Sequence, residues 1–180
     1  MANICVFCAS GQALEPRWFT LAGDVGAALA GRGHKVVSGG GRVGMMGALV
    51  EGARKAGAYT IGVIPQTLVD LEVADAESDE LVITDGMAAR KTVMLERADA
   101  FLILPGGLGT LDELFEVWTL ATLGLHAKPI VLLDVDGFYQ GLLAWLTSLA
   151  SQRFVRSEGL AMVRVARSVD EALDEVERFV

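Results

Sequence analysis

The sequence predicts an α/β fold in which helices cover both faces of one parallel sheet. Short apolar runs of strand length alternate with longer amphipathic stretches along the chain, which is typical of repeated βαβ units. The hydrophobic fraction is high, at 52% of 180 residues, as expected for strands buried on both faces. This length also suits one hydrophobic core. We therefore predict a single doubly wound, Rossmann-like domain spanning residues 1–180.

Each expected strand is an apolar run, and each expected helix is an amphipathic stretch. The strands are Ile4–Cys8, Lys35–Ser38, Thr60–Ile64, Leu81–Thr84, Ala100–Leu104, Ile130–Leu133 and Met162–Val165. The helices are Arg17–Arg32, Gly44–Ala56, Met87–Arg97, Leu111–Leu123, Tyr139–Ser148 and Val169–Phe179. Right-handed crossovers place the carboxyl ends of parallel strands at one rim of the sheet, where ligands bind.

Two segments need separate interpretation. Asp70–Glu80, with the sequence DLEVADAESDE, is acidic and aperiodic, so we expect a surface loop or a flexible flap. The last helix begins with Ser168-x-x-Glu171, the pattern of a capping box, and is predicted to be purely structural.

Composition limits the classes of partner. A net charge of −8 and a pI near 4.7 oppose binding to a nucleic-acid polymer, which requires clustered Lys and Arg. A mononucleotide is still allowed, because backbone N–H groups and a few cations can hold one phosphate. No run reaches the roughly 18 apolar residues of a membrane span. The start of the chain lacks the pattern of a signal peptide, so we expect a cytoplasmic protein with no membrane attachment.

Cys5 and Cys8 have a C-x-x-C spacing but lie within one predicted strand. Residues three apart on a strand point to opposite faces, which opposes a disulfide or a shared metal ion. A zinc site would need further ligands, and the chain has only two histidines, His34 and His126. We predict buried thiols and no metal site.

The first glycine loop, residues 38–47, follows a strand and opens a helix. Its Gly39-x-Gly41-x-x-Gly44 spacing matches the dinucleotide fingerprint. Glycines allow close backbone approach and a helix N-terminus offers free N–H groups, so a phosphate is the natural ligand. NAD is disfavoured, because the next strand ends in Pro65 without the carboxylate that holds a ribose. A turn that serves only packing is the alternative.

The second glycine loop is Pro105-Gly-Gly-Leu-Gly-Thr110, between a hydrophobic strand and a helix. Its backbone and the Thr110 hydroxyl form an anion site at the helix start. No Gly-Lys-Ser/Thr follows, so this is not a Walker A loop and phosphoryl transfer from Mg-ATP is not indicated.

Glu113 has two interpretations. Thr110-x-x-Glu113 matches a capping box, in which the carboxylate only reaches back to the helix start. Alternatively, a carboxylate one turn from a phosphate loop lies where a ribose would be. Glu116 is expected to share the face of Glu113 at i, i+3 spacing, whereas Asp112 is expected only to favour the positive helix end.

Arg90 and Lys91 follow Met87 at the start of a predicted helix. Adjacent helical residues point about 100° apart, so one can face the cleft while the other pairs at its edge or in an interface. Two solvated helix charges are the alternative.

Together these motifs resemble the LONELY GUY family, the cytokinin riboside 5′-monophosphate phosphoribohydrolases, which are often labelled lysine decarboxylases. The matching motifs cover nearly the whole chain in order. They are Cys8-Ala-Ser10-Gly11, Gly39-Gly-Gly with Gly44-Met-Met-Gly47, Met87-x-x-Arg90-Lys91, Pro105-Gly-Gly-Leu-Gly-Thr-Leu-Asp-Glu113 and Gly124-Leu-His-x-Lys-Pro129. One departure is Ala88-Ala89, where the family usually has His-Glu, and it leaves the base preference open.

The resemblance implies hydrolysis of AMP or N6-isopentenyl-AMP to the free base and ribose 5-phosphate, with no cofactor. It implies that Arg90 and Glu113 are catalytic, and that the chain forms homodimers or larger homo-oligomers with sites near the interface. The substrate-binding residues implied are Ser10, Gly40, Gly41, Met87, Lys91, Pro105, Gly106, Gly107, Gly109, Thr110 and Glu116.

This chemistry suits the residue types. Cleavage of a ribosyl N–C bond builds positive charge on the sugar, and Glu113 can stabilise that charge or activate water. Arg90 either neutralises the phosphate or positions Glu113. Apolar Trp118, Met45, Met46 and Met94 are candidates for a prenyl pocket, with a place in the core as the alternative.

Two rival functions use the same residues differently. A pyridoxal-dependent decarboxylase needs a Schiff-base lysine, and of Lys35, Lys55, Lys91 and Lys128 only Lys91 is near the predicted site. A non-catalytic carrier of a nucleotide or a pterin-type cofactor would use the same glycine loops. Turnover of AMP separates the carrier from the hydrolase.

Overall fold

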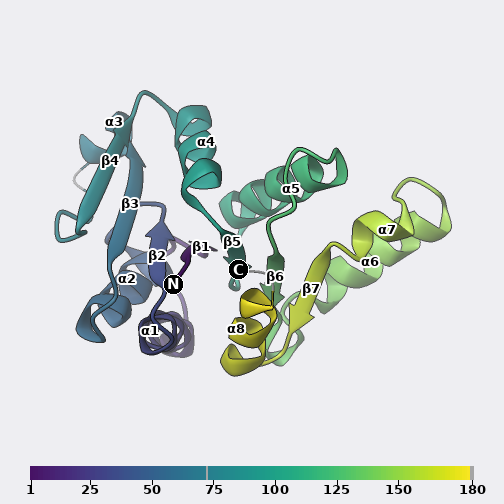
Figure 1. Ribbon diagram of the computed structural model, residues 1–180, viewed down its shortest axis with the longest axis horizontal. Coiled ribbons are helices and arrows are strands. Elements are labelled where there is room, and N and C mark those ends of the chain that lie inside the picture. The colour runs from purple at the N-terminus through teal and green to yellow at the C-terminus, as the bar shows by residue number, and fades with distance from the viewer. Residues whose placement is uncertain (72, 179–180) are drawn as a thin grey trace.

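In the computed structural model, which describes residues 1–71 and 73–178, seven parallel strands form one sheet (Figure 1). They are β1 (Asn3–Phe7), β2 (Lys35–Ser38), β3 (Thr60–Pro65), β4 (Glu80–Thr84), β5 (Ala100–Ile103), β6 (Ile130–Leu133) and β7 (Val163–Ala166). All seven predicted strands are confirmed, with ends shifted by at most one residue. The spatial order β4-β3-β2-β1-β5-β6-β7 confirms the doubly wound prediction.

Helices cover both faces of the sheet. One face carries α1 (Pro16–Gly31), α2 (Gly44–Lys55) and α8 (Val169–Glu177), and the other carries α4 (Met87–Arg97), α5 (Leu108–Thr122) and α6 (Gln140–Ser151). Three short helices were not predicted, namely α3 (Gln66–Val69), η1 (Val135–Gly137) and α7 (Ser157–Leu160). The predicted end of the last helix, Phe179, lies outside the described residues. Two predicted boundaries were wrong, because α5 begins at Leu108 and α6 ends at Ser151.

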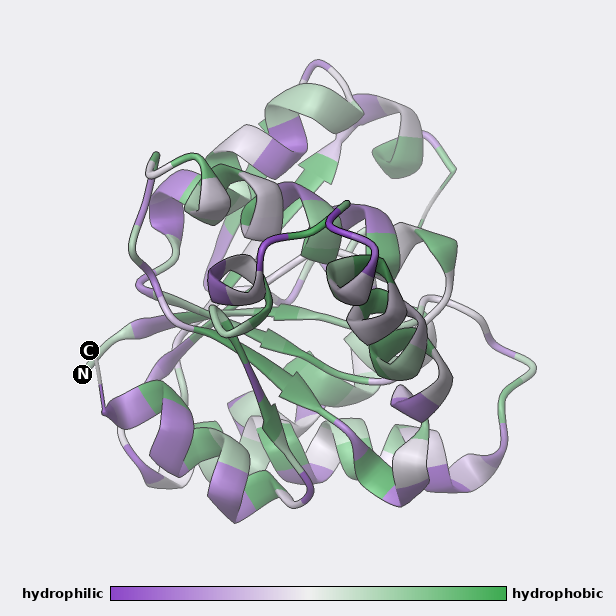
Figure 2. Cartoon of the chain, turned by 90° about the vertical axis from the view of Figure 1, so that its right-hand side faces the viewer, coloured by the Kyte–Doolittle hydropathy of each residue, from purple (hydrophilic) through white to green (hydrophobic). Residues whose placement is uncertain are grey.

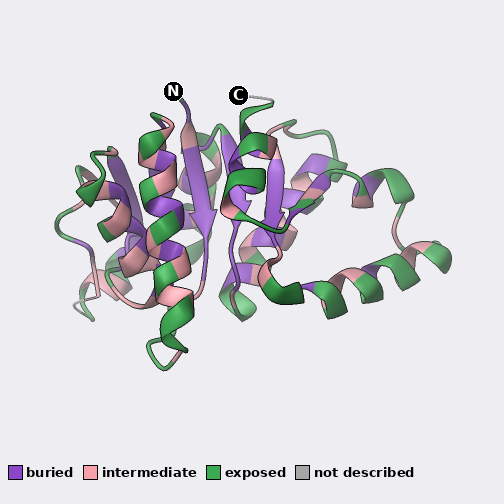
Figure 3. Ribbon diagram, turned by 90° about the horizontal axis from the view of Figure 1, so that it is seen from below, coloured by how far each residue is buried: buried purple, intermediate pink, exposed green. Residues whose placement is uncertain are grey.

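Alternation of side chains along each strand produces two apolar layers. Figure 2 shows the hydrophobic strands between helices that carry both polar and apolar bands, and Figure 3 shows the same strands as the most buried part. Cys5 belongs to the layer with α4, α5 and α6, whereas Cys8 belongs to the layer with α1, α2 and α8. Both thiols are free and buried. Their places in different layers confirm that they point to opposite faces.

The strand order reverses direction between β1 and β5, and a ligand site is expected at such a point of a doubly wound sheet. From this pair the chain continues outward in opposite directions, through β2, β3 and β4 on one side and through β6 and β7 on the other. Loops that follow β1 and β5 therefore diverge at their carboxyl ends and leave room for a ligand.

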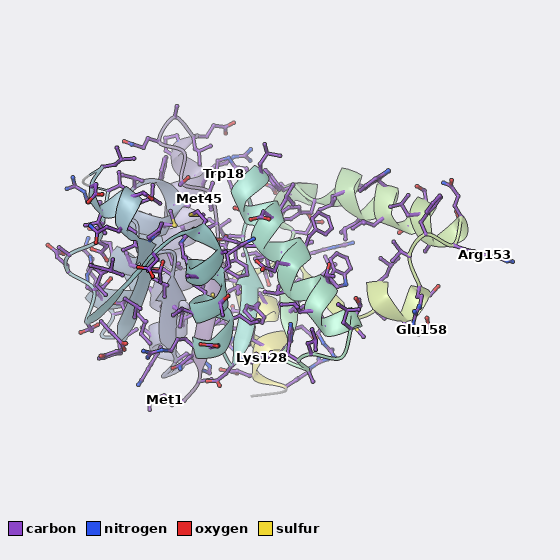
Figure 4. All side chains as sticks on the ribbon, turned by 90° about the horizontal axis from the view of Figure 1, so that it is seen from above. Met1, Trp18, Met45, Lys128, Arg153 and Glu158 are labelled. Carbon is purple, nitrogen blue, oxygen red and sulfur yellow. The ribbon has the colours of Figure 1, made fainter. Side chains whose placement is uncertain are left out.

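Beyond β7, α6 and α7 extend from the sheet as an arm, residues 140–160 (Figures 1 and 3). Figure 4 labels Arg153 and Glu158 at its far end. Several large apolar side chains of the arm and its neighbours are exposed, among them Trp145, Phe154 and Leu123. Across the described part of the chain, no helix is both long enough and apolar enough to cross a membrane.

Candidate functional site

A cavity of about 580 Å³ opens at the carboxyl rim of the sheet. It is lined by loops that follow β1, β2, β3 and β5, and by residues of α4 and α5. Most predicted site residues meet there, namely Ser10, Gly41, Met87, Arg90, Gly107, Gly109, Thr110 and Glu113. The others do not line it, namely Gly40, Lys91, Pro105, Gly106 and Glu116.

Arg90 is buried at the bottom of this cavity, and its donors are largely used by the protein. Nε donates to the Val63 carbonyl at 3.0 Å, and Nη2 donates to the Gly39 carbonyl at 3.1 Å. Nη1 lies 3.4 Å from Oε1 of Glu113. The guanidinium therefore ties the first glycine loop, β3 and α5 together, and it has only part of its fork left for a ligand.

Glu113 is a carboxyl group held largely out of water. Its side chain is 11% exposed, and burial raises its pKa from 4.5 to about 7 although Arg90 acts in the opposite direction. Burial disfavours the ionised form because the carboxylate loses its hydration. A carboxyl group in a cleft with a pKa near neutrality is suited to proton transfer.

The start of α5 differs from the prediction. Gly107 is the N-cap, so Thr110 lies in the first turn and the structure does not support the capping-box interpretation of Thr110 and Glu113. The helix begins earlier than predicted because Leu108 and Gly109 already belong to its first turn. Glu113 is consequently in the second turn, where its side chain faces Arg90 rather than the helix start.

Glycine stands at three positions of this second loop for different physical reasons. A Cβ on Gly106 would collide with the Thr110 side chain, so packing requires that glycine. At Gly107 and Gly109, no heavy atom of the described chain lies within 4 Å of an added Cβ, apart from the atoms of adjoining residues and of the helix backbone. Neither has a positive φ. These two glycines leave open space beside uncapped N–H groups at a helix start, which is the form of an anion site.

The first glycine loop is more fully occupied by the protein itself. The N–H of Met45, in the first turn of α2, donates to the Ala9 carbonyl at 2.9 Å. A Cβ on Gly44 would lie 2.5 Å from the Ser10 backbone, and a Cβ on Gly39 would collide with the Arg90 guanidinium. This loop thus supports Arg90 and the loop after β1, and its helix start is less open than that of α5.

The acidic segment after β3 forms part of the cavity wall and is not a free flap. The Arg42 N–H donates to the Val73 carbonyl, and the Asp75 N–H donates to the Gly40 carbonyl, both at 2.8 Å. The Asp75 side chain is buried and accepts from Arg54 Nη1 at 2.6 Å. The predicted surface loop is therefore anchored at Asp75, because Arg54 compensates the buried carboxylate.

Part of the cavity lining is apolar, and we call this part the apolar wall. It is formed by Leu14, Met46, Ile64, Leu68 and Val73. Of the four residues predicted for a prenyl pocket, only Met46 contributes. Trp118, Met45 and Met94 are buried in the core, which confirms the alternative interpretation for these three residues.

Sequence reasoning missed three residues of this lining, because they come from loops and a short helix without a period. Leu14 precedes α1, Leu68 lies in the unpredicted α3, and Val73 lies in the acidic segment. Their apolar side chains in polar surroundings were the only available signal.

Lys91 lies beside the site but outside the cavity. Its Nζ is 3.0 Å from Asp112 Oδ2 and 2.8 Å from Glu116 Oε2. This confirms that adjacent Arg90 and Lys91 diverge, one toward the cleft and one toward a pair at its edge. Asp112 was expected only to favour the helix end, and this was wrong because it pairs with Lys91 and also lines the cavity.

A larger cavity, of about 720 Å³, lies between α2 and residues 74–77. Five of its charged side chains already pair with one another, Arg54 with Asp75 and Glu77, and Lys55 with Glu51. The smaller cavity at the carboxyl rim has the buried Arg90–Glu113 pair and the open helix start, so it is the candidate active site.

Comparison with known proteins identifies relatives along almost the whole chain. A family model described as "Possible lysine decarboxylase" matches residues 46–176. Two proteins named cytokinin riboside 5′-monophosphate phosphoribohydrolase align over 171 residues, that of Mycobacterium marinum at 49% identity and that of Mycobacterium tuberculosis at 47%. Each alignment covers 95% of this chain and 91% of the relative. The rice protein of that name (Oryza sativa subsp. japonica, LOG) is 38% identical over 99% of this chain and 74% of its own length.

Solved structures share the fold. The molybdenum cofactor carrier protein of Chlamydomonas reinhardtii has a TM-score of 0.74 and 25% identity, over 99% of this chain and 97% of its own. The molybdenum cofactor binding protein of Rippkaea orientalis has a TM-score of 0.74 and 24% identity, over 98% and 96% of the two chains. These similarities show that other proteins share the fold of this chain.

Proposed function

Because this chain belongs to the family of the cytokinin riboside 5′-monophosphate phosphoribohydrolases, we propose that it hydrolyses the N-glycosidic bond of AMP or an N6-substituted AMP. The products are the free base and ribose 5-phosphate. The observation that carries the proposal is the buried Arg90–Glu113 pair, one helical turn from an open helix start in one cavity.

The phosphate of the substrate binds at the start of α5, residues 107–110. Gly107 and Gly109 leave open space there, and the helix dipole together with free N–H groups favours a negative charge. Thr110 lines the same cavity and can add its hydroxyl. Anchoring the phosphate orients the ribose, so that binding energy remote from the reacting bond contributes to the rate.

Glu113 acts on the ribose. The C1′–N9 bond breaks with its electron pair passing to the base, which takes up a proton, while water adds to C1′ and loses a proton. The carboxylate can stabilise the positive charge that develops on the sugar, and it can accept the proton from water. Its pKa of about 7 leaves a large fraction ionised at neutral pH.

Arg90 positions Glu113 and the first glycine loop in this scheme. Two of its three nitrogen atoms donate to backbone carbonyls, of Val63 and Gly39, and the third faces Glu113. These contacts support the positioning role over neutralisation of the phosphate, which lies at the other end of the proposed ribose.

The apolar wall of Leu14, Leu68 and Val73 is proposed to contact the base and its N6 substituent. Apolar side chains favour an N6-alkyl group over a bare amine, because they gain buried apolar area without an unpaired polar group. We infer that N6-isopentenyl-AMP is hydrolysed with a lower KM than AMP.

The label of lysine decarboxylase does not fit the lysines. All four lie within the described residues, and none lines the cavity. Lys91 is paired with two carboxylates, Lys55 pairs with Glu51, and Lys128 donates to the Leu95 carbonyl. A Schiff-base lysine must reach the carbonyl group with which it reacts.

Product analysis tests the proposed reaction. The purified protein is incubated with AMP and with N6-isopentenyl-AMP, and the products are separated by chromatography. We expect free base and ribose 5-phosphate in equal amounts. Recovery of intact nucleotide despite measurable binding would contradict the hydrolase and favour a carrier, the role named for the structural neighbour from Chlamydomonas reinhardtii.

We also propose a cytoplasmic homodimer. Support for the dimer comes from the apolar groove of about 370 Å³ between α5, α6 and α7, where Phe154 and Leu123 are exposed beside Met162. Such a surface on the arm is expected to be covered, since large exposed apolar patches mark interfaces. A second copy of this chain is the proposed occupant.

A further inference from the structure

A second ion-pair cluster flanks the Arg90–Glu113 pair. Lys91 follows Arg90 on α4, and Asp112 precedes Glu113 on α5, so the two helices are bridged twice. We call Lys91, Asp112 and Glu116 the outer clamp. Lys91 is only 19% exposed, and it holds both carboxylates at once, at 3.0 and 2.8 Å.

Two members of the outer clamp, Lys91 and Glu116, lie on the side of Glu113 that faces away from the proposed substrate, whereas Asp112 also borders the substrate cavity. Lys91 and Glu116 border a separate cavity of about 220 Å³ between α4 and α5, with Phe7 and Val117 among its walls. Glu113 lines both this cavity and the one of about 580 Å³. In the proposed scheme, the substrate therefore approaches the Glu113 carboxyl group from one side, and Lys91 and Glu116 lie on the other.

Charges of both signs surround Glu113. Apart from burial, which raises its pKa most, Arg90 and Lys91 lower the pKa while Asp112 and Glu116 raise it. Lys91 compensates two like-charged neighbours that would otherwise oppose ionisation of Glu113.

The strand beneath contributes no competing charge. Cys5 of β1 lies in the layer of α4 and α5, and Cys8, on the opposite face, borders the substrate cavity. Burial raises the pKa of both thiols, so they stay neutral. The charged residues that shift the pKa of Glu113 therefore lie on α4 and α5.

We propose that Lys91 is a positioning residue that holds α5 against α4 and cancels the charge of Asp112 and Glu116 beside Glu113, without touching the substrate. This inference rests on the proposed function, since it assigns Glu113 the catalytic role. It replaces the substrate contact that the sequence suggested for Lys91 and Glu116 with an indirect one.

The titration of Glu113 tests the clamp without any need for turnover. Carbon-13 NMR of protein labelled at glutamate Cδ follows each carboxyl group with pH, and Glu113→Gln identifies the resonance. We expect Lys91→Met to move the midpoint of Glu113 upward by about half a pH unit or more, since a nearby cation is lost. Glu116→Gln should move it downward, and the double variant should return it toward the wild-type value. Lys91→Arg should preserve the wild-type midpoint.

Two further readouts separate positioning from substrate contact. In Lys91→Met, the Kd of AMP measured by calorimetry should stay within about twofold of wild type, a change below about 0.4 kcal/mol. The midpoint of the pH profile of kcat should move upward with that of Glu113. A matched control is Lys55→Met, which removes the same charge from an exposed pair with Glu51 on α2 and should move neither midpoint.

The outcomes are distinct. Unchanged Glu113 midpoints in both Lys91→Met and Glu116→Gln would overturn the clamp, and so would a tenfold loss of AMP affinity in Lys91→Met. A wild-type protein that binds AMP and never releases base would instead contradict the proposed hydrolase, while the NMR midpoints would still decide the clamp.

Discussion

At the scale of single residues, Glu113 is a buried carboxyl group, and burial opposes its ionisation. Its pKa is about 7 in the fold and near 4.5 in an ordinary environment, with burial as the main cause. The folded protein therefore binds this proton more tightly than the unfolded chain does. Stability falls as the pH rises between these two values, and the loss is complete above the folded pKa.

Glu113→Gln should for this reason stabilise the protein in alkaline solution. The amide resembles the neutral acid, and Arg90 keeps its two backbone acceptors. Denaturant unfolding should show a gain on the order of 3 kcal/mol at about pH 8 that shrinks toward zero at about pH 4.5. A gain that is the same at both pH values, or a loss at about pH 8, would contradict the assigned pKa.

Gly109 gives a second prediction at this scale. It lies in the first turn of α5 with open space at its Cβ, so alanine fits the fold and helix propensity favours it. We expect Gly109→Ala to gain up to about 1 kcal/mol of stability and to lose AMP affinity, because the methyl group occupies the proposed phosphate site. Gly141→Ala, in an open position of α6 far along the chain, is the matched control and should change stability alone. Unchanged AMP affinity in Gly109→Ala would place the phosphate elsewhere.

Motif residues could be placed from the sequence, but the cavity wall could not. Arg90 and Glu113 lie in local patterns whose chemistry is specific, and the fold brings them to 3.4 Å. Leu14, Leu68 and Val73 lie in loops and a short helix, where no period indicates which side a residue faces. Their position depends on long-range contacts that a local pattern does not contain.

At the scale of elements, the largest errors in the predicted helix bounds are at the start of α5 and at the end of α6. The pattern Thr110-x-x-Glu113 predicted a helix start, yet α5 begins at Leu108 with Gly107 as N-cap. Leu108 and Gly109 had no capping signal, and the loop geometry extends the helix over them. The same pattern at Ser168 was correct, since the Ser168 hydroxyl accepts from the Glu171 N–H.

The anchored acidic segment provides the element-scale prediction. Arg54 compensates the buried carboxylate of Asp75, whose neighbours Val73 and Ala74 pair with the first glycine loop. Arg54→Met leaves that carboxylate without its cation, at a cost of about 2 kcal/mol or more in unfolding free energy. We also expect KM for AMP to rise about tenfold, equivalent to about 1.4 kcal/mol, because the cavity wall loosens.

Steady-state kinetics and denaturant unfolding measure both effects of Arg54→Met. Lys55→Met is the control on the same helix, because its exposed partner Glu51 stays hydrated when the cation is lost. A loss of stability with an unchanged KM would mean that the segment does not shape the site.

At the scale of the whole molecule, the alternation of strand and helix patterns was sufficient to predict the sheet. The five inner strands were found because they are largely buried on both faces and read as short apolar runs. The edge strands β4 and β7 are more exposed but still read as apolar runs. The arm of α6 and α7 was only partly predicted. Its helices pack lightly on the core, so their pattern is not that of a single buried face.

The exposed apolar side chains of the arm predict self-association. Phe154 is 78% exposed and borders the groove between α5 and α7. Light scattering after size exclusion should give the mass of a dimer or a larger assembly for the wild type, and Phe154→Asp should shift the equilibrium toward the monomer. A wild-type monomer at micromolar concentration would contradict the proposed interface.

The central claim is that Glu113 performs chemistry at a nucleotide site built by α4 and α5. The most direct test measures Glu113→Gln in two ways on one preparation, as the Kd of AMP by calorimetry and as the rate of ribose 5-phosphate release. We predict a Kd within a few-fold of wild type and a rate about 100- to 10,000-fold lower, the range for loss of a general base. Release of ribose 5-phosphate at the wild-type rate would contradict the account and leave Glu113 with a structural role.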